Sequence, residues 1–222
     1  MGDEPLATRA SWNPQTRPLY FTHHPNWRPP GVEVVANGLV FVALPMGTPL
    51  PPMVLPRARL DGEEDPRVPK DQLTRNLIGN FHFMVGFSLA RTDWPRAREE
   101  FVEAEAAAPE SATLFFNIGQ VFALRGFYDE AIAAFEHTYE LQPRALLAAG
   151  APRAADEIAK WSAERDRIGA LELELEKSTT AMPAHGTPDY HRRMSELLSL
   201  RGEELAARGH KLRALEADAG TS

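Results

Sequence analysis

The apolar residues between positions 112 and 145 recur every three or four residues, in two runs that a glycine separates. The positions that define this pattern are Phe115, Ile118, Gly119, Phe122, Gly126, Ala131, Phe135 and Pro143. Residues three and four apart share one face of a helix, so the spacing predicts two amphipathic helices. A turn is expected at Gly126. Pro143 is expected to end the second helix, because proline has no amide hydrogen to donate. The stretch therefore predicts one helical hairpin.

The same positions carry the signature spacing of a tetratricopeptide repeat, and residues 112 to 145 closely resemble one. The resemblance implies that Gly119 lets the second helix approach and that Phe135 fills the space between the helices. A shift of 34 residues finds a second copy, whose matching positions are Trp94, Ala97, Phe101, Ala104 and Pro109. The first helix of that copy, from about Asn76 to Arg91, diverges from the repeat. We expect it to meet the N-terminal region instead of another repeat.

Two further helical regions are expected after the repeats of residues 71–145. Residues 152–180 are rich in Ala, Glu, Lys and Leu and predict one long amphipathic helix, with a coiled-coil dimer seam as the alternative interpretation. Residues 190–222 resemble a degenerate third repeat or a polar cap. In that alignment Gly202, Gly209 and Ala214 take the places of Gly119, Gly126 and Ala131. The alternative is a chance match of Gly and Ala in a leucine-rich helix pair.

The first 70 residues differ in composition, because they hold 13 of the 19 prolines and carry no net charge. β-branched and aromatic residues at 17–22 and 32–44 predict strands, with a hairpin turn at Asn37-Gly38. We expect a strand-bearing segment over residues 1–46 and a proline-rich, acidic linker over 47–70. The predicted fold class is mainly α, a tetratricopeptide-type solenoid of helical hairpins with this small strand-bearing, proline-rich segment at its N-terminus.

A second resemblance covers residues 15–45. An Arg-Pro-Leu-Tyr-Phe segment, a Gly-Leu-Val-Phe segment and then tetratricopeptide repeats are similar to the soluble C-terminal tail of multi-spanning membrane glycosyltransferase-like proteins (GT-C type). The resemblance implies that the transferase chemistry lies elsewhere, since the family's proposed catalytic acids are in membrane loops that this sequence does not contain. No catalytic residue is carried over.

Composition and motifs disfavour several functions. A net charge of -7 without a dense basic stripe disfavours nucleic-acid binding, and the absence of cysteine excludes disulfides, thiolate metal sites and cysteine nucleophiles. No run of about 20 apolar residues and no export signal is present, so cytoplasmic location is the default and extracytoplasmic location follows only if the chain is a membrane protein's tail.

Candidate catalytic and metal-binding groups are scattered along the sequence. Neither a phosphate-binding loop nor a zinc-protease or serine-hydrolase motif is present, and His185, His191 and His210 form no visible ligand set. The sequence therefore predicts no enzyme, no cofactor and no metal site.

A binding surface is the function that the pattern favours. In tetratricopeptide proteins the first helix of each repeat lines the concave groove. The resemblance assigns contacts with a protein or peptide partner to His82, Leu89, Thr113, Phe116, Asn117, Gln120 and Leu124. Phe116 is the preferred contact, since Phe115 serves the core and the next residue points about 100° away; packing against the helix at 154–180 is its alternative. The predicted function is a scaffold or adaptor, with the accessory tail of a membrane glycosyltransferase-like protein as the alternative.

Overall fold

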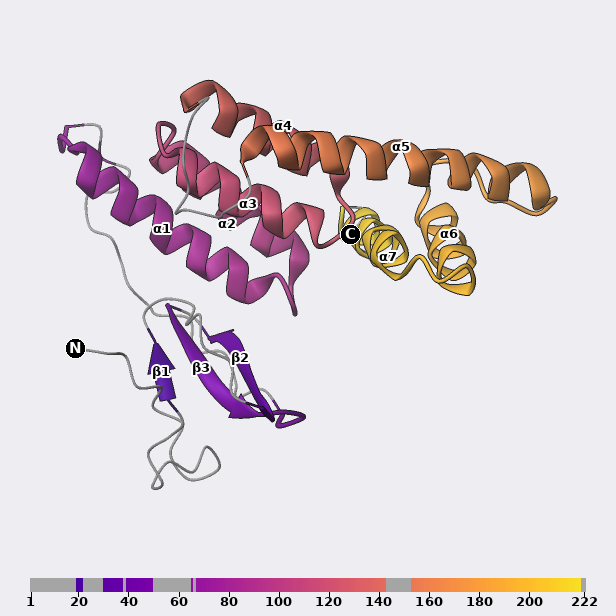
Figure 1. Ribbon diagram of the computed structural model, residues 1–222, viewed down its shortest axis with the longest axis horizontal. Coiled ribbons are helices and arrows are strands. Elements are labelled where there is room, and N and C mark those ends of the chain that lie inside the picture. Colours follow the sequence, from indigo (N-terminus) through magenta and orange to yellow (C-terminus); the bar gives the residue numbers. More distant parts are fainter. Residues whose placement is uncertain are drawn as a thin grey trace. The chain divides into compact units, whose positions relative to one another are not determined.

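A computed structural model describes residues 19–21, 30–37, 39–49, 65, 67–142 and 153–220. The chain forms two compact units, Met1–Glu100 and Phe101–Ser222, which divide inside one helix. Helices make up most of the second unit, and the first unit combines helix with a small antiparallel sheet (Figure 1). The predicted class, mainly α with a small strand-bearing N-terminal segment, is confirmed.

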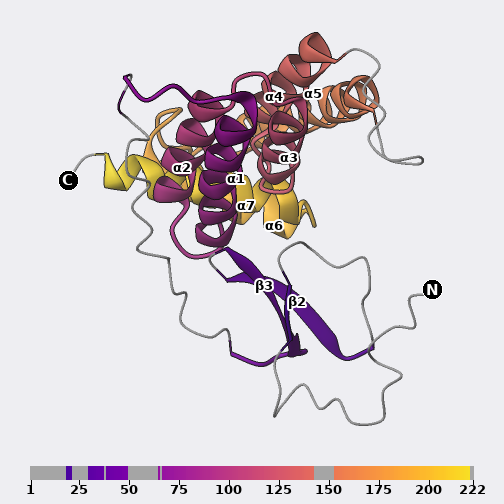
Figure 2. The same ribbon diagram turned by 90° about the vertical axis from the view of Figure 1, so that its left-hand side faces the viewer.

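In the described part of the first unit, the sheet has three antiparallel strands in the order β1-β3-β2. They are β1 (Leu19–Phe21), β2 (Val32–Asn37) and β3 (Val40–Pro45). Strands β2 and β3 lie side by side in both ribbon views (Figure 1, Figure 2), and Val35 pairs with Val42 across them. Both of these valines are buried. The paired ends Asn37 and Val40 leave a two-residue connection, as a hairpin requires.

Helix α1 (Gln72–Leu89) packs on this sheet. Asp71 caps its N-terminus, where the carboxylate accepts a hydrogen bond from the amide of Thr74 at 2.7 Å. Near the other end, the Phe87 ring lies 6.2 Å from that of Phe41 on β3, and α1 also contacts β2. The expectation that this helix meets the N-terminal region is confirmed.

Helix α2 (Trp94–Ala107) carries the division between the units. Its last part belongs to the second unit, where the Phe101 ring lies 5.8 Å from the Phe122 ring. Helices α3 (Ala112–Ala123) and α4 (Tyr128–Leu141) follow as an antiparallel hairpin. The predicted hairpin is therefore present in the structure.

Gly119 and Phe135 hold α3 and α4 together. A Cβ on Gly119 would lie 2.8 Å from the Phe135 ring, closer than side-chain atoms pack, and that ring is completely buried. The glycine thus leaves the space that the ring fills, as the sequence analysis expects. The chain turns at Gly126, whose φ of 78° suits glycine.

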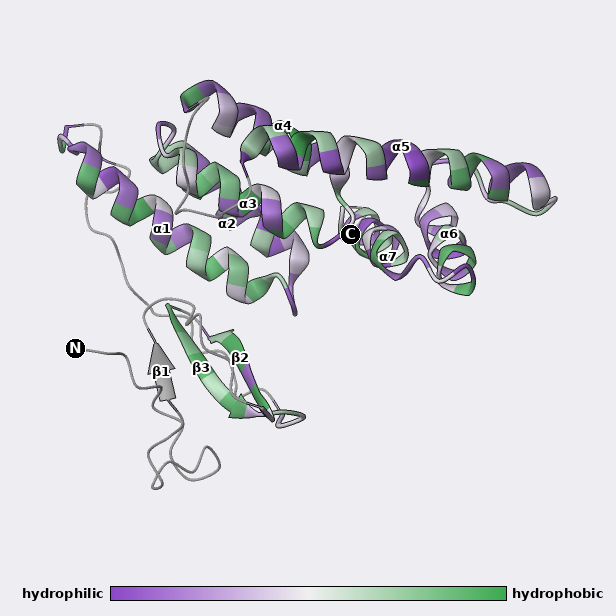
Figure 3. Cartoon of the chain, in the orientation of Figure 1, coloured by the Kyte–Doolittle hydropathy of each residue, from purple (hydrophilic) through white to green (hydrophobic). Residues whose placement is uncertain are grey.

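Helix α5 (Ala154–Ser178) is the longest element, and its apolar stripe faces the rest of the second unit. Trp161, Ile168 and Leu175 recur every seven residues and are all buried. The Trp161 ring stacks on Tyr128 of α4 at 5.8 Å between centroids. Because these three residues are covered within the chain, they are not free to form the coiled-coil dimer seam that is the alternative interpretation of this helix. Figure 3 shows the contrast between α3, where apolar residues dominate, and α5, where they alternate with polar ones.

The last two helices, α6 (Pro188–Leu200) and α7 (Glu204–Ala219), form a second hairpin in this unit. Gly202 makes the turn with a φ of 79°, and the amide of Glu203 donates to the carbonyl of Leu198. The turn at Gly126 has the same pattern, since the amide that follows it donates to the carbonyl five residues back.

This turn corrects the predicted alignment of the C-terminal repeat. Gly202 corresponds to Gly126 and not to Gly119, so the predicted alignment is wrong by seven residues. Gly209, which was expected to be the turn, lies inside α7. Ala207, not Ala214, takes the position of Ala131. Spacing alone allowed both alignments, because either Gly202 or Gly209 can be matched to Gly126.

Gly209 marks the place where α7 crosses the turn between α3 and α4. A Cβ on Gly209 would lie 2.9 Å from the carbonyl oxygen of Arg125, and one on Gly126 would lie 2.7 Å from the carbonyl oxygen of Leu205. Both atoms belong to the backbone, which cannot move aside as a side chain can. Helix α7 therefore lies directly on the turn, backbone against backbone.

Several predicted features lie outside the described residues. They are Gly38, Pro143, most of the linker at 47–70, and the part of the second resemblance that falls on residues 15–18 and 22–29.

The contact between Gly119 and Phe135 is tested by Gly119→Ala. Alanine normally stabilises a helix by about 1 kcal/mol relative to glycine. Here overpacking against the buried ring should outweigh that gain and lower the free energy of unfolding by about 1–3 kcal/mol in urea denaturation. Gly169→Ala is the matched control, because beyond the adjoining backbone of α5 nothing lies within 4 Å of its Cβ position. The control should be neutral or stabilising; equal stability gains in both variants would contradict the packing account.

Candidate binding surfaces

Helix α3 is covered on all but one narrow face. Its nine buried residues are Ala112, Leu114, Phe115, Phe116, Ile118, Gly119, Val121, Phe122 and Ala123. The remaining positions Thr113, Asn117 and Gln120 are four and three residues apart and continue to Leu124 at the end of the helix. We call these four residues the α3 stripe. Four of the five predicted contact residues on this helix belong to it.

The α3 stripe combines unpaired amides with an exposed apolar end. The side chains of Asn117 and Gln120 are partly exposed, and neither has a hydrogen-bond partner in the described part of the chain. Each amide offers both a donor and an acceptor, the same pair of groups that a peptide backbone offers. Leu124 is 57% exposed, and Thr113 lies open at the other end. The stripe can therefore bind both polar backbone and an apolar side chain.

Phe116, the preferred contact in the sequence analysis, is not on the stripe. It is 7% exposed, and its ring lies 5.3 Å from that of Phe135. Phe115, 8% exposed, packs on His137 with ring centroids 4.2 Å apart. A rotation of 100° does not carry a side chain out of the core here, because α3 is covered on several sides. The structure gives Phe116 a packing role within the α3–α4 hairpin, and its packing against α5 stays a prediction.

The two predicted contacts on α1 are also engaged within the first unit. Leu89 is buried at 3% exposure. His82 Nδ1 lies 2.8 Å from a carboxylate oxygen of Glu100, and both side chains are less than one-fifth exposed. Neither residue presents an open surface comparable with the α3 stripe.

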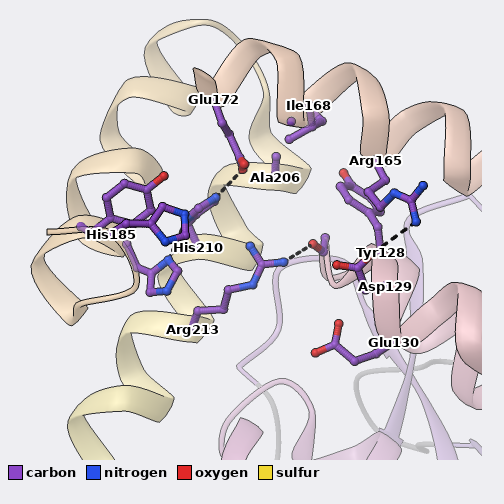
Figure 4. Close-up of a pocket in the computed structure, with 14 residues that line it drawn as sticks. Tyr128, Asp129, Glu130, Arg165, Ile168, Glu172, His185, Ala206, His210 and Arg213 are labelled. Atoms are coloured by element: carbon purple, nitrogen blue, oxygen red, sulfur yellow. Dashed lines mark hydrogen bonds and ion pairs between the residues drawn. The ribbon is translucent and has the colours of Figure 1, made fainter. Parts of the chain in front are cut away.

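A pocket in the second unit is a feature that the sequence analysis missed. Its volume is about 430 Å³, and it lies between the start of α4 and helices α5, α6 and α7 (Figure 4). The lining residues are Gly126, Tyr128, Asp129, Glu130, Arg165, Ile168, Gly169, Glu172, His185, Tyr190, His191, Ala206, His210 and Arg213. Figure 4 shows His185, His210 and Arg213 on one side and Tyr128, Asp129 and Arg165 on the other.

The three C-terminal histidines, which look scattered in the sequence, gather at this pocket. Nε2 of His210 lies 2.5 Å from a carboxylate oxygen of Glu172, and its Nδ1 lies 3.0 Å from Nδ1 of His191. An ionised carboxylate only accepts, so Nε2 of His210 carries a proton. The contact between the two Nδ1 atoms then holds one proton, because two N–H groups facing each other would repel.

The predicted alignment of the C-terminal repeat is wrong, and for this reason the sequence did not predict the histidine cluster. With the turn at Gly209, His210 would begin the final helix, far from His191. With the turn at Gly202, the antiparallel hairpin brings His191 and His210 opposite each other. Recognition of Gly202 as the turn glycine was the missing signal.

The pocket shifts the ionisation of several of its groups, among them His191 and both of its tyrosines, Tyr128 and Tyr190. Burial lowers the pKa of His191 to about 4, with further lowering by His210, Arg213 and His185 and a smaller opposing effect of Glu172. Burial also raises the pKa of Tyr128 to about 12. At neutral pH the His191 imidazole and the Tyr128 hydroxyl are therefore uncharged.

The described residues hold no group of three or more His, Cys, Asp or Glu side chains arranged to bind a metal ion. No helix in the described ranges is both long enough and apolar enough to cross a bilayer. Comparison of the chain with protein-family models, curated proteins and solved structures gives no match.

The burial of His191 predicts acid sensitivity. The folded state lowers the pKa of His191 from its ordinary 6.5 to about 4, so between these values the unfolded state binds more protons. The contribution of neutral His191 to the free energy of unfolding is fully present above pH 6.5 and is lost as the pH falls toward 4. His191→Asn should remove this part of the decline, about 1–3 kcal/mol of unfolding free energy, in urea denaturation at pH 7 and pH 4.5.

The control for this experiment is His137→Asn, which removes a half-exposed imidazole on α4. It should keep the wild-type decline. If His191→Asn declines as steeply as the wild type, protonation of buried His191 does not govern acid stability.

Proposed function

We propose that the chain is a tetratricopeptide-type repeat protein that binds a peptide or helix of another protein on the α3 stripe. The α3 stripe is the observation that carries the proposal. Within the described residues, it leaves one face of an otherwise covered helix open, with unpaired amides in its middle and an exposed leucine at its end.

The hairpin chemistry supports the family assignment. Gly119 stands where the repeat needs a close approach, and Phe135 fills the space that it leaves. Gly126 makes the turn with a positive φ, and Ala131 is completely buried behind it. These are the roles that the resemblance implies for these positions.

The length of the stripe fits a short peptide. Thr113 and Leu124 are eleven residues apart, which corresponds to about 16 Å along a helix. An extended chain advances about 3.3 Å per residue, so about five residues of a ligand span the stripe. Asn117 and Gln120 lie near the middle of this length, where they would pair with the ligand backbone, and Leu124 would contact an apolar side chain at one end.

The accessory-tail alternative rests on residues 15–45, part of which lies outside the described residues. The remaining residues offer no specific observation in its favour.

A random peptide library displayed on phage and selected on the purified protein tests the proposal. The affinity of a selected peptide is then measured by isothermal titration calorimetry. The double variant Asn117→Ala/Gln120→Ala should weaken binding by about 10- to 100-fold, since each lost hydrogen bond costs about 0.5–1.5 kcal/mol. Its melting temperature should stay close to the wild type, because neither amide is bonded within the described residues.

The matched control is Gln72→Ala/Asn80→Ala, which removes two exposed amides from α1. It should leave the affinity unchanged. Selected peptides that bind the stripe variant as tightly as the wild type would show that the partner site is elsewhere.

A further inference from the structure

Among the described residues, Arg213 is the arginine of the pocket without an acidic partner. Its Nη2 donates to the carbonyl of Gly126 at 3.0 Å, and its guanidinium lies 5.0 Å from the centre of the Phe127 ring. No carboxylate pairs with it among the described residues. Arg165, the other arginine of the pocket, is paired with Asp129 and Asp166. Within the described residues, guanidinium N–H groups of Arg213 are thus left for a further acceptor.

Tyr128 contributes a second unpaired donor. The residue lines the same pocket and is 4% exposed, and its hydroxyl has no hydrogen-bond partner within the described part of the chain. Stacking on Trp161 fixes the ring. A buried hydroxyl without a partner destabilises the protein, so a ligand atom that bonds to it is favoured.

The charges of the lining select the kind of ligand. Arg213 lines the pocket together with Tyr128, Tyr190 and His191, so its charge lies among the polar groups of the pocket. The acidic lining residues Asp129, Glu130 and Glu172 would repel a multiply charged anion. Burial keeps His191 neutral, so it supplies no second cation for a phosphate dianion. A single negative charge fits this lining best.

We propose that this pocket binds a small molecule with one carboxylate, which Arg213 holds and to which Tyr128 donates a hydrogen bond. The planar guanidinium matches a carboxylate in a paired, two-bond geometry. The volume of about 430 Å³ falls within the range of small-molecule sites. The proposal is independent of the α3 stripe, because none of the four stripe residues lines the pocket.

The probes are benzoate and propionate, each with its neutral amide, and inorganic phosphate. The full chain, labelled with nitrogen-15, is titrated with each probe and followed by NMR. Benzoate or propionate should shift the amide signals of Gly126, Asp129 and Arg213 in a saturable manner. Benzamide and propionamide should bind at least about tenfold more weakly, since they carry no charge for Arg213. Phosphate should also bind at least about tenfold more weakly.

Tyr128→Phe is the decisive variant, because it removes the hydroxyl and keeps the ring. The affinity for the bound carboxylate should fall by about three- to tenfold, while the melting temperature stays equal or rises. Tyr139→Phe is the matched control: Tyr139 lies on the same helix, is 45% exposed and does not line the pocket. The Tyr139→Phe variant should bind the carboxylate with the affinity of the wild type. Arg213→Lys keeps the charge without the paired geometry and should weaken binding by about tenfold.

Three results would overturn the proposal. They are equal binding of benzoate and benzamide, wild-type affinity in Tyr128→Phe, and tighter binding of phosphate than of either carboxylate. Asn117→Ala/Gln120→Ala should leave carboxylate binding unchanged, so failure of this site and failure of the peptide site are distinguishable.

Discussion

The second unit depends on a backbone contact between α7 and the turn that joins α3 to α4. Gly209 meets the carbonyl of Arg125, and Gly126 meets the carbonyl of Leu205, at distances that leave no room for a Cβ on either glycine. The positive φ of Gly126 also requires a residue that tolerates this conformation. The close backbone contact and the positive φ of Gly126 both act on this turn, and together they fix where the C-terminal hairpin lies.

The pocket follows from this contact. Because α7 lies on the turn, Ala206, His210 and Arg213 come next to Tyr128 at the start of α4. Helix α5 closes another side through Ile168 and its neighbours, and Tyr128 stacks on Trp161 of the same helix. The α3 stripe belongs to a different surface, so the two proposed binding sites lie on separate parts of the second unit.

Sequence patterns predicted the helices better than their contacts. The pair Gly119 and Phe135 was predictable, because a glycine within an apolar stripe has few other uses. The burial of Phe116 was not, since periodicity does not say how many sides of a helix are covered. The cluster of His191 with His210 depended on identifying Gly202 as the turn, and glycine spacing allowed two alignments. Four of the five groove residues predicted on α3 are open, whereas both predicted on α1 are engaged within the first unit.

The unfolding free energy of Gly209→Ala tests the central claim most directly. In an ordinary helix this substitution stabilises the protein by about 0.5–1 kcal/mol. In this protein the new methyl group would meet the carbonyl of Arg125 at 2.9 Å, so we expect a loss of about 1–3 kcal/mol in urea denaturation. A gain in stability would show that α7 does not lie on the turn. It would also contradict the explanation that this contact forms the pocket.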